Sequence, residues 1–136
     1  MKLSATSDNS APIEEIVQLK KILFVETGFG CDQHGQDPTK AAVRACRNAI
    51  EFNSIPCIRD IIPGGRENMI LRVQVAVPES DKVDVSQLRK VFPYGKMMPP
   101  EITEGGMKAS SGIAIPELND KNDQMYIAVA VVTVGY

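Results

Sequence analysis

The chain has 136 residues, of which 43% are hydrophobic and 24% are charged, and its formal net charge is −2. This length fits one domain with a real core, and the small negative charge argues against nucleic acid as a partner. No apolar run is long enough to cross a membrane. Residues 1–16 are polar and lack the apolar stretch of a secretory signal, so we expect a flexible arm there and a single α/β domain over residues 17–136.

The cysteine content indicates the redox compartment. The chain has three cysteines, Cys31, Cys46 and Cys57, and none of them forms a CxxC pair. An odd count without a secretory signal is typical of reduced thiols inside a cell, so we expect a cytoplasmic protein.

The first two predicted elements are a strand and a helix. Ile22–Val25 is a short apolar run bounded by Gly28, which is typical of a buried strand. The helix is expected over Asp37–Asn53, with Asp37 as its N-cap and Pro38 at its first helical position. Its apolar stripe has helical spacing and comprises Ala42, Val43, Cys46, Ala49 and Ile50.

A loop and a second strand follow. Residues 54–68 contain Pro and Gly turn signals and are expected to form a loop. Asn68–Pro78 alternates between apolar and mixed positions, which predicts a strand with one buried face.

The last third of the chain predicts a short helix and two more strands. The helix is expected over Asp84–Phe92. Gly95–Ser110 is expected to be extended and close to an edge of the sheet, because Pro99–Pro100 interrupts it. Gln124–Tyr136 is apolar on both faces, which is typical of a central strand covered on both sides.

The expected order of elements is therefore β-α-β-α-β-β. The simplest fold for this order is an α+β fold in which a four-stranded mixed sheet carries two helices on one face. Two helices leave the other face of the sheet uncovered, yet the last strand is apolar there too. A second copy of the chain is the economical cover, so we expect a homo-oligomer.

Two stretches resemble a family of short conserved hypothetical proteins. They are Val25–Ile50, with the sequence VETGFGCDQHGQDPTKAAVRACRNAI, and Val129–Gly135, with the sequence VAVVTVG. The resemblance extends over residues 21–136, and its most specific part is HGQDPTKAAVRA at His34–Ala45. It implies no particular chemistry.

The element order also resembles the trimeric fold shared by the small bacterial chorismate mutases and the reactive-imine deaminase family. This resemblance implies a homotrimer with its pockets between subunits.

A third resemblance is to one repeat of the cyanuric acid hydrolase and barbiturase family. It depends on TGFGC at Thr27–Cys31 and ASSG at Ala109–Gly112. It implies a cyclic amide substrate and a serine nucleophile, Ser110 or Ser111. The lysine of that family precedes its first glycine motif, where this chain has Val25 and Glu26.

The residues themselves place a candidate site between the first strand and the first helix. Asp32, His34 and Asp37, with Glu26 nearby, are competent either to bind a divalent metal ion or to act as an acid–base cluster. The alternative is a polar loop in which Asp37 caps the helix and His34 bonds to backbone. No cofactor motif is evident, and a divalent metal stays an open alternative.

Other residues of the same turn have both a functional and a structural interpretation. Cys31 lies one turn ahead of the helix and is either a nucleophilic thiol or a packing residue. Gly28, Gly30 and Gly35 lead into the helix N-terminus, where backbone N–H groups can bind an anion. The alternative is a turn that requires a positive φ.

Basic residues elsewhere are candidates for binding an anionic ligand. Arg72 lies on the polar face of the second strand, where it either grips a carboxylate or phosphate or pairs with Glu26 or Asp32. Lys108 precedes Ser110 on the same side of an extended segment, as a base would for a serine nucleophile, or the segment is a polar hairpin turn.

We therefore expect an oligomer, most simply a trimer, that binds a small anionic or cyclic amide compound at a subunit interface. In a hydrolase-like or deaminase-like enzyme, His34 is the acid–base group, the nucleophile is Ser110, Ser111 or Cys31, and Arg72 or Arg44 anchors the substrate. The alternatives are a non-catalytic ligand-binding or metal-binding protein and a purely structural oligomer.

Overall fold

The computed structural model describes residues 18–136, so the arm expected over residues 1–16 lies outside the described residues. The helices are α1 (Pro38–Ile50), α2 (Ile58–Ile61) and α3 (Val85–Arg89), with short 3₁₀ turns at Arg66–Asn68, Ser80–Lys82 and Pro116–Leu118. The strands are β1 (Ile22–Asp32), β2 (Ile70–Val77), β3 (Lys96–Met97), β4 (Glu101–Glu104), β5 (Met107–Ser110) and β6 (Gln124–Gly135).

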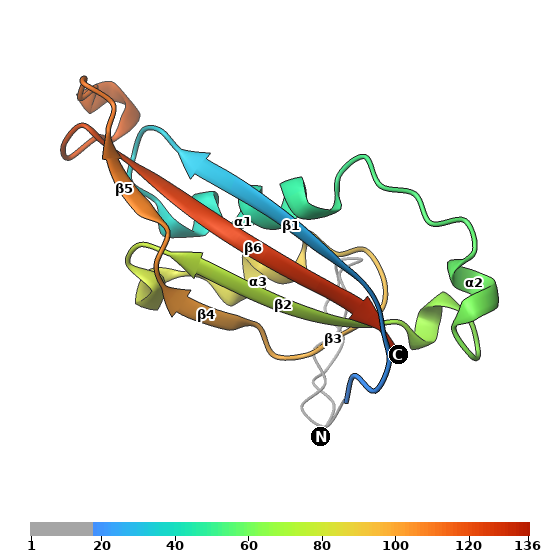
Figure 1. Ribbon diagram of the computed structural model, residues 1–136. Helices are drawn as coiled ribbons and strands as arrows, with labels where there is room; N and C mark the ends of the chain where they lie inside the picture. The colour runs from blue at the N-terminus through green and yellow to red at the C-terminus, as the bar shows by residue number, and fades with distance from the viewer. Residues whose placement is uncertain (1–17) are drawn as a thin grey trace.

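All six strands belong to one mixed sheet, in which β6 is the central strand (Figure 1). β1 and β2 flank β6 and are antiparallel to it, and β3 and β4 pair in parallel with β2. β5 pairs with the first residues of β6, beyond the point where β2 ends. The α+β class and the central position of the last strand agree with the prediction.

The expected number of four strands is wrong, because the segment 95–110 forms three short strands instead of one. Pro99–Pro100 separates β3 from β4, since proline has no N–H to donate to a neighbouring strand. Gly105–Gly106 separates β4 from β5, and Gly106 adopts a positive φ of 67° that favours glycine. The loop expected over 54–68 also contains α2 and a 3₁₀ turn.

β1 is longer than the sequence predicts, since it continues from Val25 through Asp32. Its backbone pairs with β6 along this whole length, from Phe24 opposite Val134 to Asp32 opposite Tyr126. Glu26, Cys31 and Asp32, which we expected in a turn, therefore lie on the strand, and the turn begins only at Gln33.

α1 begins as predicted. The Asp37 side chain accepts hydrogen bonds from the backbone N–H groups of Thr39 at 2.9 Å and Lys40 at 3.3 Å, which makes it the N-cap. The helix ends at Ile50, three residues before the expected end. Its buried face consists of small residues: Ala41, Ala42, Ala45, Cys46 and Ala49.

The core lies between α1 and one face of the sheet. Figure 1 shows α1 and α3 on the same side of the strands. The expected alternation in β2 is confirmed, and its buried residues meet those of β6 in this core. They are Leu71, Val73, Val75 and Val77 of β2 with Ala128, Ala130, Val132 and Val134 of β6.

The other face of the sheet carries exposed apolar side chains. Phe29 is 63% exposed, and Val129, directly opposite it on β6, is 47% exposed. Val25 lies on the same face of β1 and is 54% exposed. Among residues 18–136, no helix is long and apolar enough to span a membrane.

Candidate functional site

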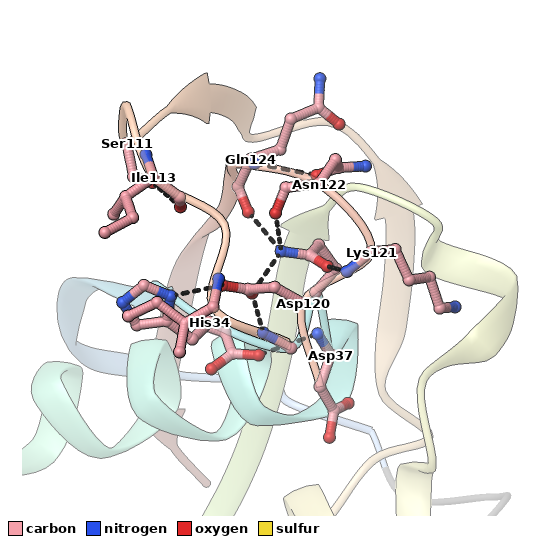
Figure 2. Close-up of polar contacts among 12 residues, drawn as sticks. His34, Asp37, Ser111, Ile113, Asp120, Lys121, Asn122 and Gln124 are labelled. Carbon is pink, nitrogen blue, oxygen red and sulfur yellow. Dashed lines mark hydrogen bonds and ion pairs between the residues drawn. The ribbon is translucent and has the colours of Figure 1, made fainter. Parts of the chain in front are cut away.

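The candidate site forms where the end of β1 meets the start of β6. Because these strands are antiparallel, the turn after Asp32 lies beside the loop that precedes Gln124. Figure 2 shows this loop folding over the turn, so that His34 and Asp120 point toward one another. The pairing of two strands thus joins segments that are 86 residues apart in sequence.

The Asp120 carboxylate is the centre of this arrangement. Its Oδ2 lies 2.7 Å from His34 Nδ1 and accepts a hydrogen bond from Ile115 N–H at 2.8 Å. Its Oδ1 accepts from Gly35 N–H at 2.7 Å and from Gln36 Nε2 at 2.9 Å. The side chain is 1% exposed. These donors, with the Ile115 backbone N–H first, hold the pKa of Asp120 well below its usual range, so the carboxylate stays ionised.

An ionised Asp120 fixes the orientation and the tautomer of His34. A carboxylate only accepts hydrogen bonds, so His34 Nδ1 carries the hydrogen in the 2.7 Å contact. In the neutral ring, Nε2 is then left with a free lone pair. The His34 side chain keeps 26% of its surface exposed, so the imidazole ring is accessible from solvent.

The Gln36 side chain also connects the turn to the loop that precedes β6. It adopts a positive φ of 50° and is only 7% exposed. Its Nε2 donates to the carbonyl oxygen of Gln124 at 2.8 Å as well as to Asp120, and its Oε1 accepts from Lys121 N–H at 2.9 Å. The buried amide is therefore satisfied at both ends, which stabilises one arrangement of the two segments.

His34 opens into a cavity of about 570 Å³ at the N-terminal end of α1. This volume falls within the range of small-molecule sites. The lining residues come from the end of β1, from α1 and from the loop before β6: Cys31, Asp32, Gln33, His34, Lys40, Arg44, Glu117, Leu118 and Asn119.

Two cations of α1 face this cavity. Arg44 Nη1 donates to the carbonyl oxygen of Cys31 at 2.7 Å and lies 3.6 Å from Asp32 Oδ1. Asp32 is 2% exposed, and its Oδ2 also accepts from Asp37 N–H at 2.9 Å. Lys40 forms no ion pair within the described part of the chain, so its charge remains available to an anionic ligand.

The candidate nucleophiles lie in three different settings. Cys31 lines the cavity, but burial, followed by the charge of Asp32, raises the pKa of its thiol, which favours the neutral form. Ser110 donates to the Asp123 carboxylate, and Ser111 Oγ donates to the carbonyl oxygen of Ile113 at 2.9 Å. Neither serine lines the cavity.

Two predicted basic residues lie away from His34. Arg72 Nε donates to Glu101 Oε2 at 2.9 Å, and both side chains are exposed. Lys108 lies 3.6 Å from Glu79 and above the ring of Tyr126. The partner of Arg72 is therefore Glu101, rather than the Glu26 or Asp32 considered from the sequence.

The remaining predicted residues lie along β1. Gly28 and Gly30 lie under α1, where a side chain at either position would overlap the helix backbone. Glu26 is near the other end of α1 and accepts a hydrogen bond from Asn53 at 2.5 Å. Because Glu26 and Asp32 are six strand residues apart, about 20 Å separates them, and they belong to different sites.

The turn does not bring together enough side chains to form the metal site considered from the sequence. Within residues 18–136, no three His, Cys, Asp or Glu side chains converge in a way that could hold a metal ion. His34 is instead engaged with one carboxylate, that of Asp120.

The loop that completes the site is not identifiable from the sequence pattern we used. Asp120, Gln36 and Asn119 were not among the candidates, although the run ELNDKND at 117–123 is rich in polar residues immediately before a strand. That run was the available signal. Its pairing with the His34 turn depends on the register between β1 and β6.

Comparison with known proteins identifies a protein family, and similar solved structures exist. The model of a conserved hypothetical protein family, Lin0512, matches residues 22–134. A crystal structure of an FtsZ-like protein of unknown function from Nostoc punctiforme superposes with a TM-score of 0.73 at 47% identity, over 84% of this chain and 93% of that chain. Among curated proteins, none matches the chain. The chain belongs to the Lin0512 family of conserved hypothetical proteins.

Proposed function

We propose that this protein is an oligomeric enzyme of the hydrolase or deaminase type, which binds a small anionic or cyclic amide compound in the His34 cavity. The observation that carries the proposal is the buried, ionised Asp120 that holds His34 Nδ1 at 2.7 Å. A carboxylate that orients an imidazole in this way is the arrangement by which enzymes prepare a histidine for proton transfer.

The surroundings of His34 support proton transfer without a covalent intermediate. The Cys31 thiol is kept neutral, and Ser110 and Ser111 lie outside the cavity. His34 Nε2 would therefore take a proton from water or from the substrate itself, while Lys40 and Arg44 attract the negative charge of a ligand. The same geometry without a reacting group describes the alternative, a non-catalytic binding protein.

The exposed face of the sheet supports the oligomer. Phe29, Val129 and Val25 together form an apolar surface that no helix of residues 18–136 covers. Burying this surface against a second and third copy would remove it from water. The His34 cavity is open to solvent, and a neighbouring subunit would enclose it, as in the trimeric chorismate-mutase-like fold that the element order expected from the sequence resembles.

The enzymatic proposal predicts a specific loss in His34→Gln. We expect this variant to bind its ligand within a few-fold of the wild type, whereas its rate falls about a hundredfold or more, because glutamine cannot carry the proton. The measurement is ring opening of a panel of cyclic amides, including barbiturate and cyanurate, followed by ultraviolet absorbance. Binding to the same panel is followed by calorimetry.

Lys121→Gln is the matched control, because it changes a charge on the same loop outside the cavity. If His34→Gln turns over a substrate as fast as the wild type does, the role given to His34 is contradicted. Binding without turnover anywhere in the panel would favour the non-catalytic alternative, and no binding at all would contradict the site.

If the exposed face of the sheet is the subunit interface, Phe29→Asp should change the mass of the assembly in solution. Native mass spectrometry of the wild type should give the mass of a trimer, and the variant should give a monomer, because a charge would be buried at each interface. Phe52→Asp is the control, since Phe52 is fully exposed and lies on the loop after α1. A monomeric wild type, or a Phe29→Asp variant that remains a trimer, would contradict this interface.

A further inference from the structure

A second cavity lies at the opposite end of α1 from His34. It has a volume of about 500 Å³, and its walls are the first half of β1, the last turn of α1, the loop 53–69 and the segment after α3. Figure 1 shows that this loop, which carries α2, extends past the C-terminal end of α1. The cavity is therefore separate from the candidate site described above, and none of the proposed catalytic residues lines it.

The floor of this second cavity is apolar. Phe24, Leu71, Phe92 and Val134 contribute to it, and all four belong to or pack against the buried core. A floor of this kind binds the hydrocarbon part of a small molecule, because the bound part leaves water.

Glu26 brings one carboxylate to this apolar floor. Asn53 Nδ2 donates to Glu26 Oε2 at 2.5 Å and is the one side chain of the described residues that donates to this carboxylate. Burial raises the pKa of Glu26, which means that its charge is poorly compensated. A carboxylate can accept several hydrogen bonds, so a positively charged donor in the cavity would stabilise it.

Two arginines bring positive charge to the same cavity. Arg59 and Arg66 line it, and no acid of residues 18–136 lies within ion-pairing distance of either guanidinium. Arg66 instead lies over the ring of Tyr94, 5.0 Å from its centroid, which holds the guanidinium at the wall of the cavity. The cavity thus contains one carboxylate and two guanidinium groups that do not form ion pairs with one another.

We propose that this cavity binds a small zwitterion with an apolar side chain, of the amino acid class. The ligand's ammonium group would contact Glu26, its carboxylate would contact Arg59 and Arg66, and its side chain would lie on Phe24 and Leu71. A ligand with both charges satisfies both sets of protein groups, whereas a molecule with only one charge leaves the other set unpaired.

The test uses three related probes on the full-length protein. They are L-phenylalanine, 3-phenylpropionate, which lacks the ammonium group, and phenethylamine, which lacks the carboxylate. We expect L-phenylalanine to bind at least about tenfold more tightly than either of the other two, as measured by calorimetry or ligand-observed NMR. Equal binding of all three probes, or no binding of L-phenylalanine at millimolar concentration, would overturn the proposal.

Two variants assign the charges to their residues. Glu26→Gln should weaken L-phenylalanine binding about tenfold and leave 3-phenylpropionate within about threefold, since only the ammonium contact is lost. Arg66→Gln should weaken both of these probes and leave phenethylamine unchanged. Arg47→Gln on α1, which lines neither cavity, is the control. If Glu26→Gln weakens all three probes alike, the ammonium contact is refuted.

The outcome is independent of the enzyme proposed for the His34 cavity. His34→Gln removes no group of the second cavity and should leave L-phenylalanine affinity unchanged. Loss of L-phenylalanine binding in His34→Gln would place the ligand in the His34 cavity and overturn the assignment made here.

Discussion

Gly30→Ala is expected to lower the free energy of unfolding by roughly 3 kcal/mol, a large part of the stability of a domain this size. A Cβ at Gly30 would overlap the backbone nitrogen of Ala45 and lie 2.5 Å from the carbonyl oxygen of Ala41. These atoms belong to the backbone of α1, so no side-chain rotation relieves the overlap. The measurement is urea denaturation followed by circular dichroism.

Gly28→Ala should act in the same direction, because its Cβ would lie 2.6 Å from the Ala45 carbonyl oxygen and closer still to the Ala49 backbone. Thr27→Val is the control on the exposed side of the same strand, and we expect it to stay within about 0.5 kcal/mol of the wild type. A Gly30→Ala protein with an unchanged urea midpoint would show that α1 can move away from β1, contrary to the close packing described here.

Asp120→Asn is expected to give the second large effect, on both stability and the state of His34. Each Asp120 oxygen accepts two hydrogen bonds, so the amide NH₂ of asparagine must face either His34 and Ile115 or Gly35 and Gln36. The buried NH₂ would then point at two donors, of which only His34 Nδ1 can become an acceptor, by a change of tautomer. We expect a melting temperature lower by roughly 5–10 °C, measured by calorimetry at pH 7.

The difference between wild type and Asp120→Asn should depend on pH. The folded-state pKa of Asp120 lies below its ordinary value of 3.8, so its contribution is complete above that pH and is lost as the pH falls further. The two proteins should therefore converge in melting temperature below about pH 3.8. Glu117→Gln, an exposed acid on the same loop, should show no such convergence.

The imidazole of His34 gives a second readout for the same variant. In the wild type at a pH where the ring is neutral, ¹⁵N NMR should show the hydrogen on Nδ1 and none on Nε2. In Asp120→Asn both tautomers should be populated, since an amide can either donate to Nδ1 or accept a hydrogen bond from it. A wild-type ring with its hydrogen on Nε2 would contradict the role given to Asp120.

The sequence by itself determined the elements whose signals are local. Asp37 and Pro38 mark the start of α1 because a cap and a first helical residue act within one turn. The alternation of Leu71, Val73 and Val75 identified β2, since successive side chains of a strand point to opposite faces. The apolar character of both faces of β6 likewise indicated its central place in the sheet.

The tertiary structure alone decided how the two cavities are composed. The sequence grouped Glu26 with His34, but β1 continues to Asp32 and so carries them to opposite ends of α1. It left Asp120 out, because the contact with His34 spans 86 residues and depends on the register of β1 against β6. No local pattern records such a register, since it is set by side chains that meet only after the strands have paired.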